Sequence, residues 1–217
     1  MKVDTILFDL DGTLVNTNEI SINSFKYAIE THYPSKVPNR EKIMTFFGPT
    51  LQETFKDYAE SEEKVNEMVQ SYLSHYKEIE HEMYVLYPGV FEVLSKLKEA
   101  RYNLGIVTTK YRKSAMPSII NFKLDEIFDV IITLDDVENP KPSREPIDIA
   151  LAKFDNHEGA IMVGDNISDI IAGKNAEVFT SGVAWTILGE NVLQELNPDF
   201  MLQSMDDLFL VLEKLNT

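Results

Sequence analysis

The sequence predicts an α/β protein whose parallel β-sheet is interrupted, after its first strand, by an all-helical segment. From residue 88 onward, short apolar runs alternate with helical patterns of about ten residues, which is typical of consecutive βαβ units. Between residues 16 and 84, apolar residues instead recur at helical spacing, and no convincing strand appears. We therefore expect a core formed by residues 1–15 and 85–217, with residues 16–84 as an inserted helical domain.

The first expected element is a short buried strand within residues 5–12 that ends in a turn. In the helical segment, Ile22, Phe25 and Ile29 follow the helical spacing, and prolines divide the segment into several helices. The acidic and lysine-rich run at residues 57–64 is interpreted as a solvated helix face. Because the sheet resumes beyond the helical segment, the two ends of that segment must lie close together.

The remaining elements alternate after Pro88 and Gly89. We expect helices at residues 90–100, 113–121, 146–154 and 167–175, and strands at residues 104–107, 128–132, 160–163 and 178–185. Strands that are joined by single helices in this way lie parallel in one sheet. Their carboxyl ends therefore meet at one edge of the sheet.

Composition excludes several classes of function. The chain has 217 residues, a length of one to two domains, and at this size roughly 70% of the unfolded surface becomes buried on folding. It has no cysteine, which excludes disulfides, thiolate metal sites and cysteine nucleophiles. Its net charge of −16 argues against nucleic acid or an anionic membrane as a partner. The first apolar run contains two aspartates and is too short for a signal peptide or a membrane span, so we expect a cytoplasmic protein.

Asp9 and Asp11 flank Leu10 at the end of the first expected strand. Side chains alternate along a strand, so both carboxylates are expected on one side, with their Cα atoms about 6–7 Å apart. Two like charges there are costly unless a cation or a proton separates them. In an open parallel sheet, ligands bind at the carboxyl ends of the strands, where this pair falls. A polar strand end that makes a turn is the alternative for this pair alone.

A second acidic pair, Asp165 and Asp169, follows the strand expected at residues 160–163. Asp169 falls in the first turn of the next helix, where the helix dipole favours negative charge. N-capping by Asp165 or Ser168 is the alternative for this pair alone. Because both pairs fall at equivalent strand ends, three or four carboxylates are expected to converge. Oxygen ligands without cysteine or histidine nearby select a hard cation, and Mg²⁺ with phosphate is the commonest case.

Basic residues are scarce, yet several fall near the same strand ends. Thr108, Thr109 and Lys110 follow the strand expected at residues 104–107, and a hydroxyl with backbone N–H groups before a helix can bind an anion. Lys141 lies between two prolines, which keep its loop extended. Three further cations fall near these strand ends, namely Arg112, Lys113 and Arg144. The alternatives are an ordinary threonine-rich strand end and an exposed loop lysine. Trp185, at the end of an expected strand, is interpreted as a core residue.

Four of these segments, in chain order, resemble the four-motif pattern of the haloacid dehalogenase (HAD) superfamily. They are Asp9-Leu-Asp11-Gly-Thr13, Thr108, Lys141-Pro142 and Gly164-Asp165-x-x-x-Asp169. The helical segment resembles the type-1 helical cap of that superfamily, and the resemblance implies a Rossmann-like parallel core covered by the cap. Residues 6–19, Phe47-Gly48-Pro49 and residues 105–110 are among the segments that resemble the superfamily's inorganic pyrophosphatases and phosphoglycolate phosphatases.

The resemblance implies a Mg²⁺-dependent phosphohydrolase. Asp9 would be the nucleophile that forms an aspartyl phosphate, and Asp11 would be the general acid and then the general base. Mg²⁺ would be held by Asp9, the Asp11 backbone carbonyl and Asp165, with Asp169 ordering its waters. In this interpretation the second aspartate of the first pair favours phosphoryl transfer over dehalogenation.

The resemblance also assigns residues to the substrate. Thr108 and Lys141 would hold the transferring phosphoryl oxygens, and Thr109 and Gly48 would contact the rest of the substrate. Pyrophosphate needs positive groups for its second phosphate, and Lys110 and Arg112 are the candidates. We expect a small phosphorylated substrate, with pyrophosphate preferred and phosphoglycolate or another small phosphomonoester as the alternative. A sugar-phosphate mutase and a phosphoacceptor signalling protein are less favoured. Monomer and homodimer both remain open.

The chain departs from the superfamily pattern at two places. Ser143-Arg144-Glu145 follows Lys141-Pro142, where members often carry an aspartate or Ala-Pro. Asn175-Ala-Glu177 stands where Ala-Gly is more usual. Glycine favours the left-handed conformation at a helix end, so we expect the helix at residues 167–175 to end differently.

Overall fold

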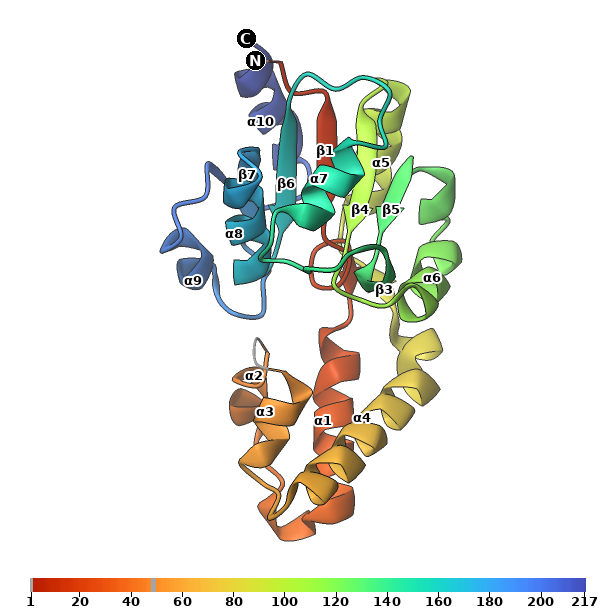
Figure 1. Ribbon diagram of the computed structural model, residues 1–217, viewed down its shortest axis with the longest axis vertical. Coiled ribbons are helices and arrows are strands. Elements are labelled where there is room, and N and C mark those ends of the chain that lie inside the picture. Colours follow the sequence, from red (N-terminus) through yellow and green to blue (C-terminus); the bar gives the residue numbers. More distant parts are fainter. Residues whose placement is uncertain (1, 48–49) are drawn as a thin grey trace. The chain divides into compact units, whose positions relative to one another are not determined.

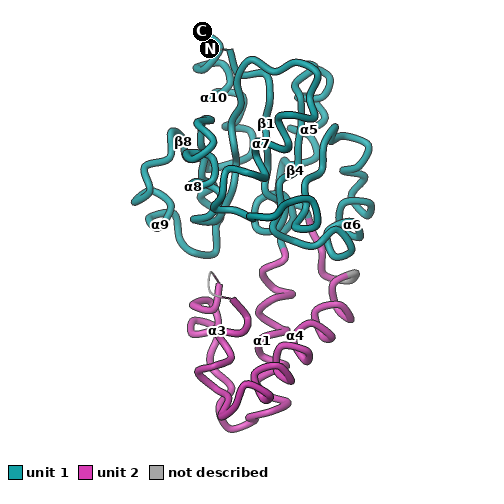
Figure 2. The backbone as a smooth tube through the Cα atoms, in the orientation of Figure 1, with its two compact units in different colours: residues 1–16, 86–217 teal, residues 17–85 magenta. Residues whose placement is uncertain are grey.

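The computed structural model describes residues 2–47 and 50–217, without the side chains of residues 81 and 82. The chain forms two compact units (Figure 2): unit 1 consists of Met1–Asn16 and Leu86–Thr217, and unit 2 of Thr17–Val85. Unit 1 carries a parallel sheet and unit 2 is built from helices, so the predicted fold class is confirmed. No helix among the described residues is long and apolar enough to cross a membrane.

The sheet of unit 1 runs in the order β5-β4-β1-β6-β7-β8, with neighbouring strands parallel (Figure 1). Its strands are β1 (Thr5–Phe8), β4 (Asn103–Val107), β5 (Val130–Ile132), β6 (Ala160–Gly164), β7 (Phe179–Val183) and β8 (Phe200–Leu202). In the central register, Phe8 of β1 lies opposite Ile106 of β4 and Val163 of β6. The residues that follow these three strands therefore reach the same edge, where the strand order reverses.

Helices connect the strands of unit 1. They are α5 (Val90–Glu99), α6 (Arg112–Asn121), α7 (Glu145–Leu151), α8 (Ile167–Asn175), α9 (Glu190–Gln194) and α10 (Asp207–Asn216), with short 3₁₀ turns at Leu124–Glu126 and Leu134–Asp136. One face of the sheet is covered by α7 and α8, because Ile147 and Ala172 share a buried cluster with Leu7, Val107 and Met162. All four residues of β1 are buried, as expected for a strand covered on both faces.

Unit 2 is organised around α1 (Asn18–His32) and α4 (Glu62–Met83), which pack against each other. Between them in the chain lie a 3₁₀ turn (Pro34–Lys36), α2 (Arg40–Met44) and α3 (Leu51–Lys56). The ring of Phe25 lies 4.7 Å from that of Tyr72 and 5.3 Å from that of Phe46, between centroids. Such aromatic contacts hold the helices together. The chain enters and leaves this unit through β2 (Val15–Asn16) and β3 (Val85–Leu86), which pair with each other.

Several segments differ from the expected elements. Residues 57–61 connect α3 to α4 instead of forming a helix face, because Ser61 caps α4 by accepting a hydrogen bond from the backbone N–H of Lys64. The strand expected at residues 178–185 ends at Val183, so Trp185 lies in the next loop and is half-buried instead of a core residue. The end of α8 does differ from a glycine end, because Glu177 itself adopts the left-handed conformation, with φ of 59°. Three elements lie beyond the segments that periodicity predicts, namely β8, α9 and α10.

Candidate active site

Three buried aspartates converge at the carboxyl edge of the sheet. Asp9 directly follows β1, Asp165 directly follows β6, and Asp169 lies in the first turn of α8. One carboxylate oxygen from each of them lies within 4.8 Å of the others, which is close enough to hold one metal ion. The convergence expected at equivalent strand ends is therefore present for three carboxylates. Asp11 is not a member of this group.

Lys141 reaches this group from the loop before α7. Its Nζ atom donates hydrogen bonds to Asp9 Oδ1 and Asp169 Oδ1, both at 2.6 Å, and to the backbone carbonyl of Val107 at 2.7 Å. Its side chain is 2% exposed. The alternative of an exposed loop lysine is therefore wrong. The ammonium group is held by three acceptors, as a buried charge requires.

The charges of this group do not balance. Three carboxylates face one ammonium ion, so two negative charges would be uncompensated in this buried site if all three were ionised. Burial raises the pKa of Asp9 to about 7, with Lys141 lowering it and Asp169 raising it. Burial and the neighbouring carboxylates of Asp9 and Asp169 also raise the pKa of Asp165 well above its ordinary value. A divalent cation would supply the missing charge, and the all-oxygen donor set fits a hard ion such as Mg²⁺.

Lys141 stays protonated in this environment. Burial alone would lower the pKa of its ammonium group, but the charges of Asp169 and Asp9, and its hydrogen bonds to them, raise that pKa above the ordinary value. Lys141 is therefore a fixed positive charge beside Asp9.

Two glycines let the carboxylates approach the backbone this closely. Gly12 has φ of 86°, and a Cβ atom there would lie 2.2 Å from Asp165 Oδ2. At Gly164, a Cβ atom would lie 2.3 Å from the side chain of Asp169. Side-chain atoms of real residues do not approach this closely, so both positions require glycine. The glycines of the first and fourth motifs thus shape the carboxylate group directly.

Asp165 and Asp169 make different contacts at the start of α8. Asn166 is the N-cap, and its Oδ1 accepts a hydrogen bond from the backbone N–H of Ser168 at 3.2 Å. Asp169 Oδ2 accepts one in return from the backbone N–H of Asn166 at 3.0 Å, which completes a capping box. The alternative interpretation, in which Asp165 or Ser168 caps this helix, is therefore wrong. The Asp165 carboxylate does not cap α8 and accepts a hydrogen bond from the Thr13 hydroxyl at 3.1 Å.

The expected anion-binding segment follows β4. Thr108 is buried, and its hydroxyl accepts a hydrogen bond from the backbone N–H of Lys110 at 3.2 Å. Thr109 is exposed. The Nζ atom of Lys110 lies 3.2 Å from Asp11 Oδ1. Asp11 therefore forms an ion pair with Lys110, whereas Asp9 forms one with Lys141.

Other expected site residues lie apart from this group. The guanidinium of Arg112 pairs with Asp136 at 2.7 Å, and that of Arg144 with Asp148 on α7 at the same distance. Lys113 is exposed. Gly48 lies outside the described residues.

Sequence reasoning missed two contacts of the loop after β7. The hydroxyl of Thr186 donates to the backbone carbonyl of Asp165, and the indole N–H of Trp185 donates to that of Thr13. The sequence signal that could have indicated these contacts is the position of Trp185 and Thr186 directly after the end of a strand.

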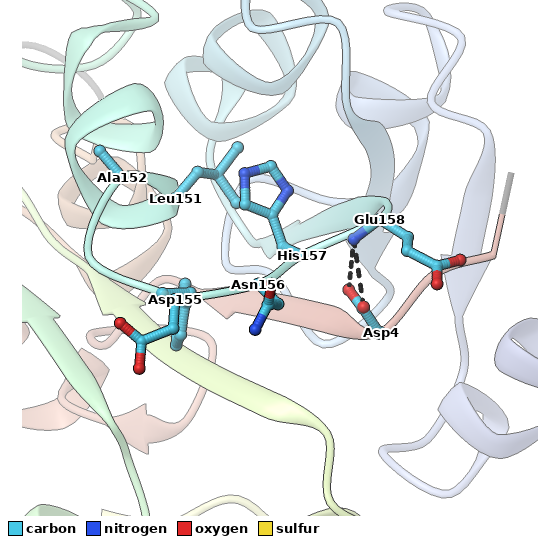
Figure 3. Close-up of a pocket in the computed structure, with 8 residues that line it drawn as sticks. Asp4, Leu151, Ala152, Asp155, Asn156, His157 and Glu158 are labelled. Atoms are coloured by element: carbon cyan, nitrogen blue, oxygen red, sulfur yellow. Dashed lines mark hydrogen bonds between the residues drawn. The ribbon is translucent and has the colours of Figure 1, made fainter.

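Unit 1 also contains a hollow of about 600 Å³ at the other edge of the sheet (Figure 3). It is lined by Asp4, which precedes β1, and by residues that precede β6, among them His157 and Glu158. The backbone N–H of Glu158 donates to both carboxylate oxygens of Asp4, at 3.1 Å each. The hollow therefore lies at the amino ends of the strands and is separate from the candidate active site. Asp4 acts there as an anchor for the loop.

Comparison with known proteins identifies relatives over the whole chain. The family model described as haloacid dehalogenase-like hydrolase matches residues 6–183. The pyrophosphatase PpaX of Bacillus anthracis is 45% identical over 217 residues, which cover 100% of this chain and 99% of that protein. PpaX of Bacillus cereus strain B4264 has the same identity and coverage.

Solved structures agree with this assignment. A haloacid dehalogenase-like family hydrolase from Streptococcus pneumoniae matches with a TM-score of 0.83 and 27% identity, over 96% of this chain and 98% of that chain. A predicted phosphatase from Clostridium acetobutylicum matches with a TM-score of 0.81 and 26% identity, over 99% and 100% of the two chains. The chain therefore belongs to the haloacid dehalogenase-like hydrolase family, and it is an enzyme of that family.

Proposed function

We propose that this enzyme is a Mg²⁺-dependent phosphohydrolase that acts through an aspartyl phosphate, with inorganic pyrophosphate as its preferred substrate. The observation that supports this most is the contact of Lys141 with Asp9 inside a buried group of three carboxylates. A nucleophile beside an ammonium ion and a cation site is suited to attack on an anionic phosphoryl group. The name of the Bacillus relatives, which are 45% identical over the whole chain, supports the choice of pyrophosphate.

The reaction proceeds in two displacements. The Asp9 carboxylate attacks phosphorus, the bond to the leaving phosphate breaks, and Asp11 donates a proton to the leaving oxygen. Asp11 then takes a proton from a water molecule, which attacks the same phosphorus and releases phosphate and the free Asp9 carboxylate. Thr108 and Lys141 hold the oxygens of the transferring group. The fixed charge of Lys141 also favours the ionised form of Asp9 and so opposes the effect of burial, which still raises the pKa of Asp9 to about 7.

The oxygen atoms present fit a divalent cation. Asp9, Asp165 and the backbone carbonyl of Asp11 would hold Mg²⁺, which when bound offsets the repulsion between the nucleophile and the phosphate. Asp169 has a different role, because its two oxygens already accept hydrogen bonds from Lys141 and from the backbone N–H of Asn166. A carboxylate engaged in this way is suited to ordering metal-bound water.

Lys110 is the proposed group for the second phosphate of pyrophosphate. It lies beside Asp11 at the end of β4, with 16% of its side chain exposed. Arg112 is less suited to this role, because its guanidinium is held by Asp136 and the backbone carbonyl of Ile131, whereas the ion pair of Lys110 is with Asp11, a residue of the first motif. A monoester such as phosphoglycolate carries a different group at this position. The contribution of Lys110 should therefore be larger for pyrophosphate.

Unit 2 is proposed as the cap domain of the enzyme. Its role would be to exclude water during phosphoryl transfer and to select the substrate. Gly48, which is proposed to contact the substrate, belongs to this part of the chain but lies outside the described residues.

The decisive experiment measures phosphate release with Mg²⁺ and with EDTA. The substrates are pyrophosphate, phosphoglycolate and a panel of sugar and nucleotide monophosphates. We expect release only with Mg²⁺, and a kcat/KM for pyrophosphate at least about tenfold above the others, a difference of about 1.4 kcal/mol in transition-state binding. A preference for phosphoglycolate would retain the mechanism and reject pyrophosphate. Equal release in EDTA would reject the metal-dependent mechanism.

Three variants complete this experiment. Asp9→Asn should abolish turnover because it removes the nucleophile, and Asp11→Asn should nearly abolish it because it removes the acid and base. Asp155→Asn, an exposed carboxylate of the hollow in Figure 3, is the matched control and should retain the wild-type rate. Wild-type turnover by Asp9→Asn would show that the nucleophile is another residue.

A further inference from the structure

The loop that follows β7 contacts Asp165 at its backbone. The hydroxyl of Thr186 donates to the carbonyl oxygen of Asp165 at 2.7 Å, and it accepts from the backbone N–H of Leu188 at 3.2 Å. Thr186 is buried, with 7% of its surface exposed. The Leu188 N–H therefore directs the hydroxyl proton toward Asp165. A single hydroxyl thus ties this loop to the residue at the end of β6.

The same loop reaches the carboxylate of Asp165 through Thr13. The indole Nε1 of Trp185 donates to the backbone carbonyl of Thr13 at 3.3 Å, and the Thr13 hydroxyl donates to Asp165 Oδ1 at 3.1 Å. Thr13 is fully buried. The ring of Trp185 also packs on that of Tyr87, with 5.7 Å between the ring centroids. Trp185 is therefore held both by the ring of Tyr87 and by the hydrogen bond to Thr13.

Asp165 needs such restraint more than an ordinary side chain does. It is buried beside Asp9 and Asp169, and like charges at this distance push the carboxylates apart. A carboxylate that turned away would weaken any cation site built on the group. Removal of a group that hydrogen-bonds to a metal ligand and orients it commonly lowers metal affinity or activity by about 10–100-fold.

We propose that Trp185 and Thr186 are positioning residues that hold Asp165 for the divalent cation and thereby set the affinity of the enzyme for that cation. This inference rests on the proposed metal site. Thr186 acts on the backbone of Asp165, and Trp185 acts on its carboxylate through Thr13. Neither residue touches the metal or the substrate in this scheme.

The test measures the binding of Mn²⁺, a probe for the Mg²⁺ site, to the full-length protein without substrate. The electron paramagnetic resonance signal of free Mn²⁺ gives the dissociation constant directly. Thr186→Val removes the hydroxyl at nearly constant shape, and Trp185→Phe removes the indole N–H but keeps a ring. We expect each variant to bind Mn²⁺ about tenfold more weakly or worse. Thr186→Ser, which restores the hydroxyl, should bind like the wild type.

A matched control separates positioning from stability. Thr180 lies in β7, is fully buried, and its hydroxyl donates to Asp199 instead of the site. Thr180→Val should therefore lower stability while leaving the Mn²⁺ dissociation constant unchanged. In kinetics, Thr186→Val should require about tenfold more Mg²⁺ for half-maximal rate and should recover much of its kcat at saturating Mg²⁺. If Thr186→Val does not fold, Trp185→Phe against the wild type gives the same comparison.

Asp165→Asn distinguishes the two ways in which the idea can fail. If Asp165→Asn loses Mn²⁺ binding while Thr186→Val and Trp185→Phe bind like the wild type, the positioning role is wrong and the proposed metal site stands. If Asp165→Asn itself binds like the wild type, the proposed metal site is wrong, and the positioning role falls with it.

Discussion

Replacing Lys141 with methionine tests how strongly one buried cation holds the carboxylate group together. Methionine keeps the apolar stem of the lysine but removes its charge. The ammonium group of Lys141 contacts Asp9 and Asp169 at 2.6 Å and the Val107 carbonyl at 2.7 Å, and its side chain is 2% exposed. The substitution therefore leaves two buried carboxylates without the ammonium that both of them face.

The expected cost follows from these contacts. Removing one partner of a buried ion pair costs about 3–5 kcal/mol of unfolding free energy. Two hydrogen bonds to charged groups, at about 1.5–3 kcal/mol each, give about 3–6 kcal/mol, which overlaps this range. Proton uptake limits the loss, because burial already raises the pKa of Asp9 to about 7. For Lys141→Met we expect a loss of about 3 kcal/mol at pH near 8, and a smaller loss near pH 6, where the carboxylates take up protons more easily.

The assay is urea unfolding in EDTA, followed by the fluorescence of Trp185, the one tryptophan of the chain, which lies in unit 1. Lys98→Met is the control, because Lys98 pairs with Asp129 at the surface, where an ion pair contributes less than about 1 kcal/mol. Equal losses for the two variants at both pH values would refute the reasoning. That result would show that the stability of the fold does not depend on Lys141 as a counter-ion.

Three further outcomes follow from the same geometry. The pKa of Asp9 is raised from 3.8 to about 7, so the native state binds more protons than the unfolded state between these pH values. The metal-free protein should therefore lose stability as the pH rises from about 4 to 7, and Mg²⁺ should restore it. Urea midpoints in EDTA that rise over this range would contradict the shift. Gly12→Ala should lower stability more than Gly189→Ala. Both glycines have left-handed φ angles, of 86° and 89°, but only a Cβ atom at Gly12 would clash with Asp165, at 2.2 Å. Thermal unfolding of the two variants measures the difference, and equal decreases in Tm would show that this clash does not matter. Lys110→Ala should raise the KM for pyrophosphate by about tenfold and that for phosphoglycolate by less, and an unchanged pyrophosphate KM would count against Lys110 as the second phosphate contact.

The three-carboxylate group was predictable from the sequence because of a property of parallel sheets. Residues that follow parallel strands lie at one edge of the sheet, so Asp9 and Asp165 were expected at the same edge, and the pairing of β1 with β6 places them side by side. The type of each element was predictable where apolar spacing was regular, as for α8. The roles of the site residues stay predictions, because no contact in the protein alone shows a substrate.

Other features depend on competition between neighbours and were not predictable. Residues 165–169 offer several side chains that can cap a helix, and only the folded geometry selects Asn166 and leaves Asp165 to the site. The partners of Lys141 could not be predicted from its loop, because the sequence of the loop alone does not distinguish a buried lysine from an exposed one. Trp185, predicted as a core residue at a strand end, instead lies half-buried in the next loop, where its indole N–H donates to the Thr13 carbonyl.

The contacts that assemble the site join parts of the chain that are far apart in sequence. Lys141 meets Asp9 across 132 positions, and Thr13 meets Asp165 across 152. Such contacts between distant positions require long loops to close, so we expect them to form late in folding. A fragment that ends before β6 lacks Asp165 and Asp169, and one that begins after β1 lacks Asp9, so neither contains the three-carboxylate group. Turnover that recovers during refolding therefore reports that these long-range contacts have formed, the β1–β6 pairing among them.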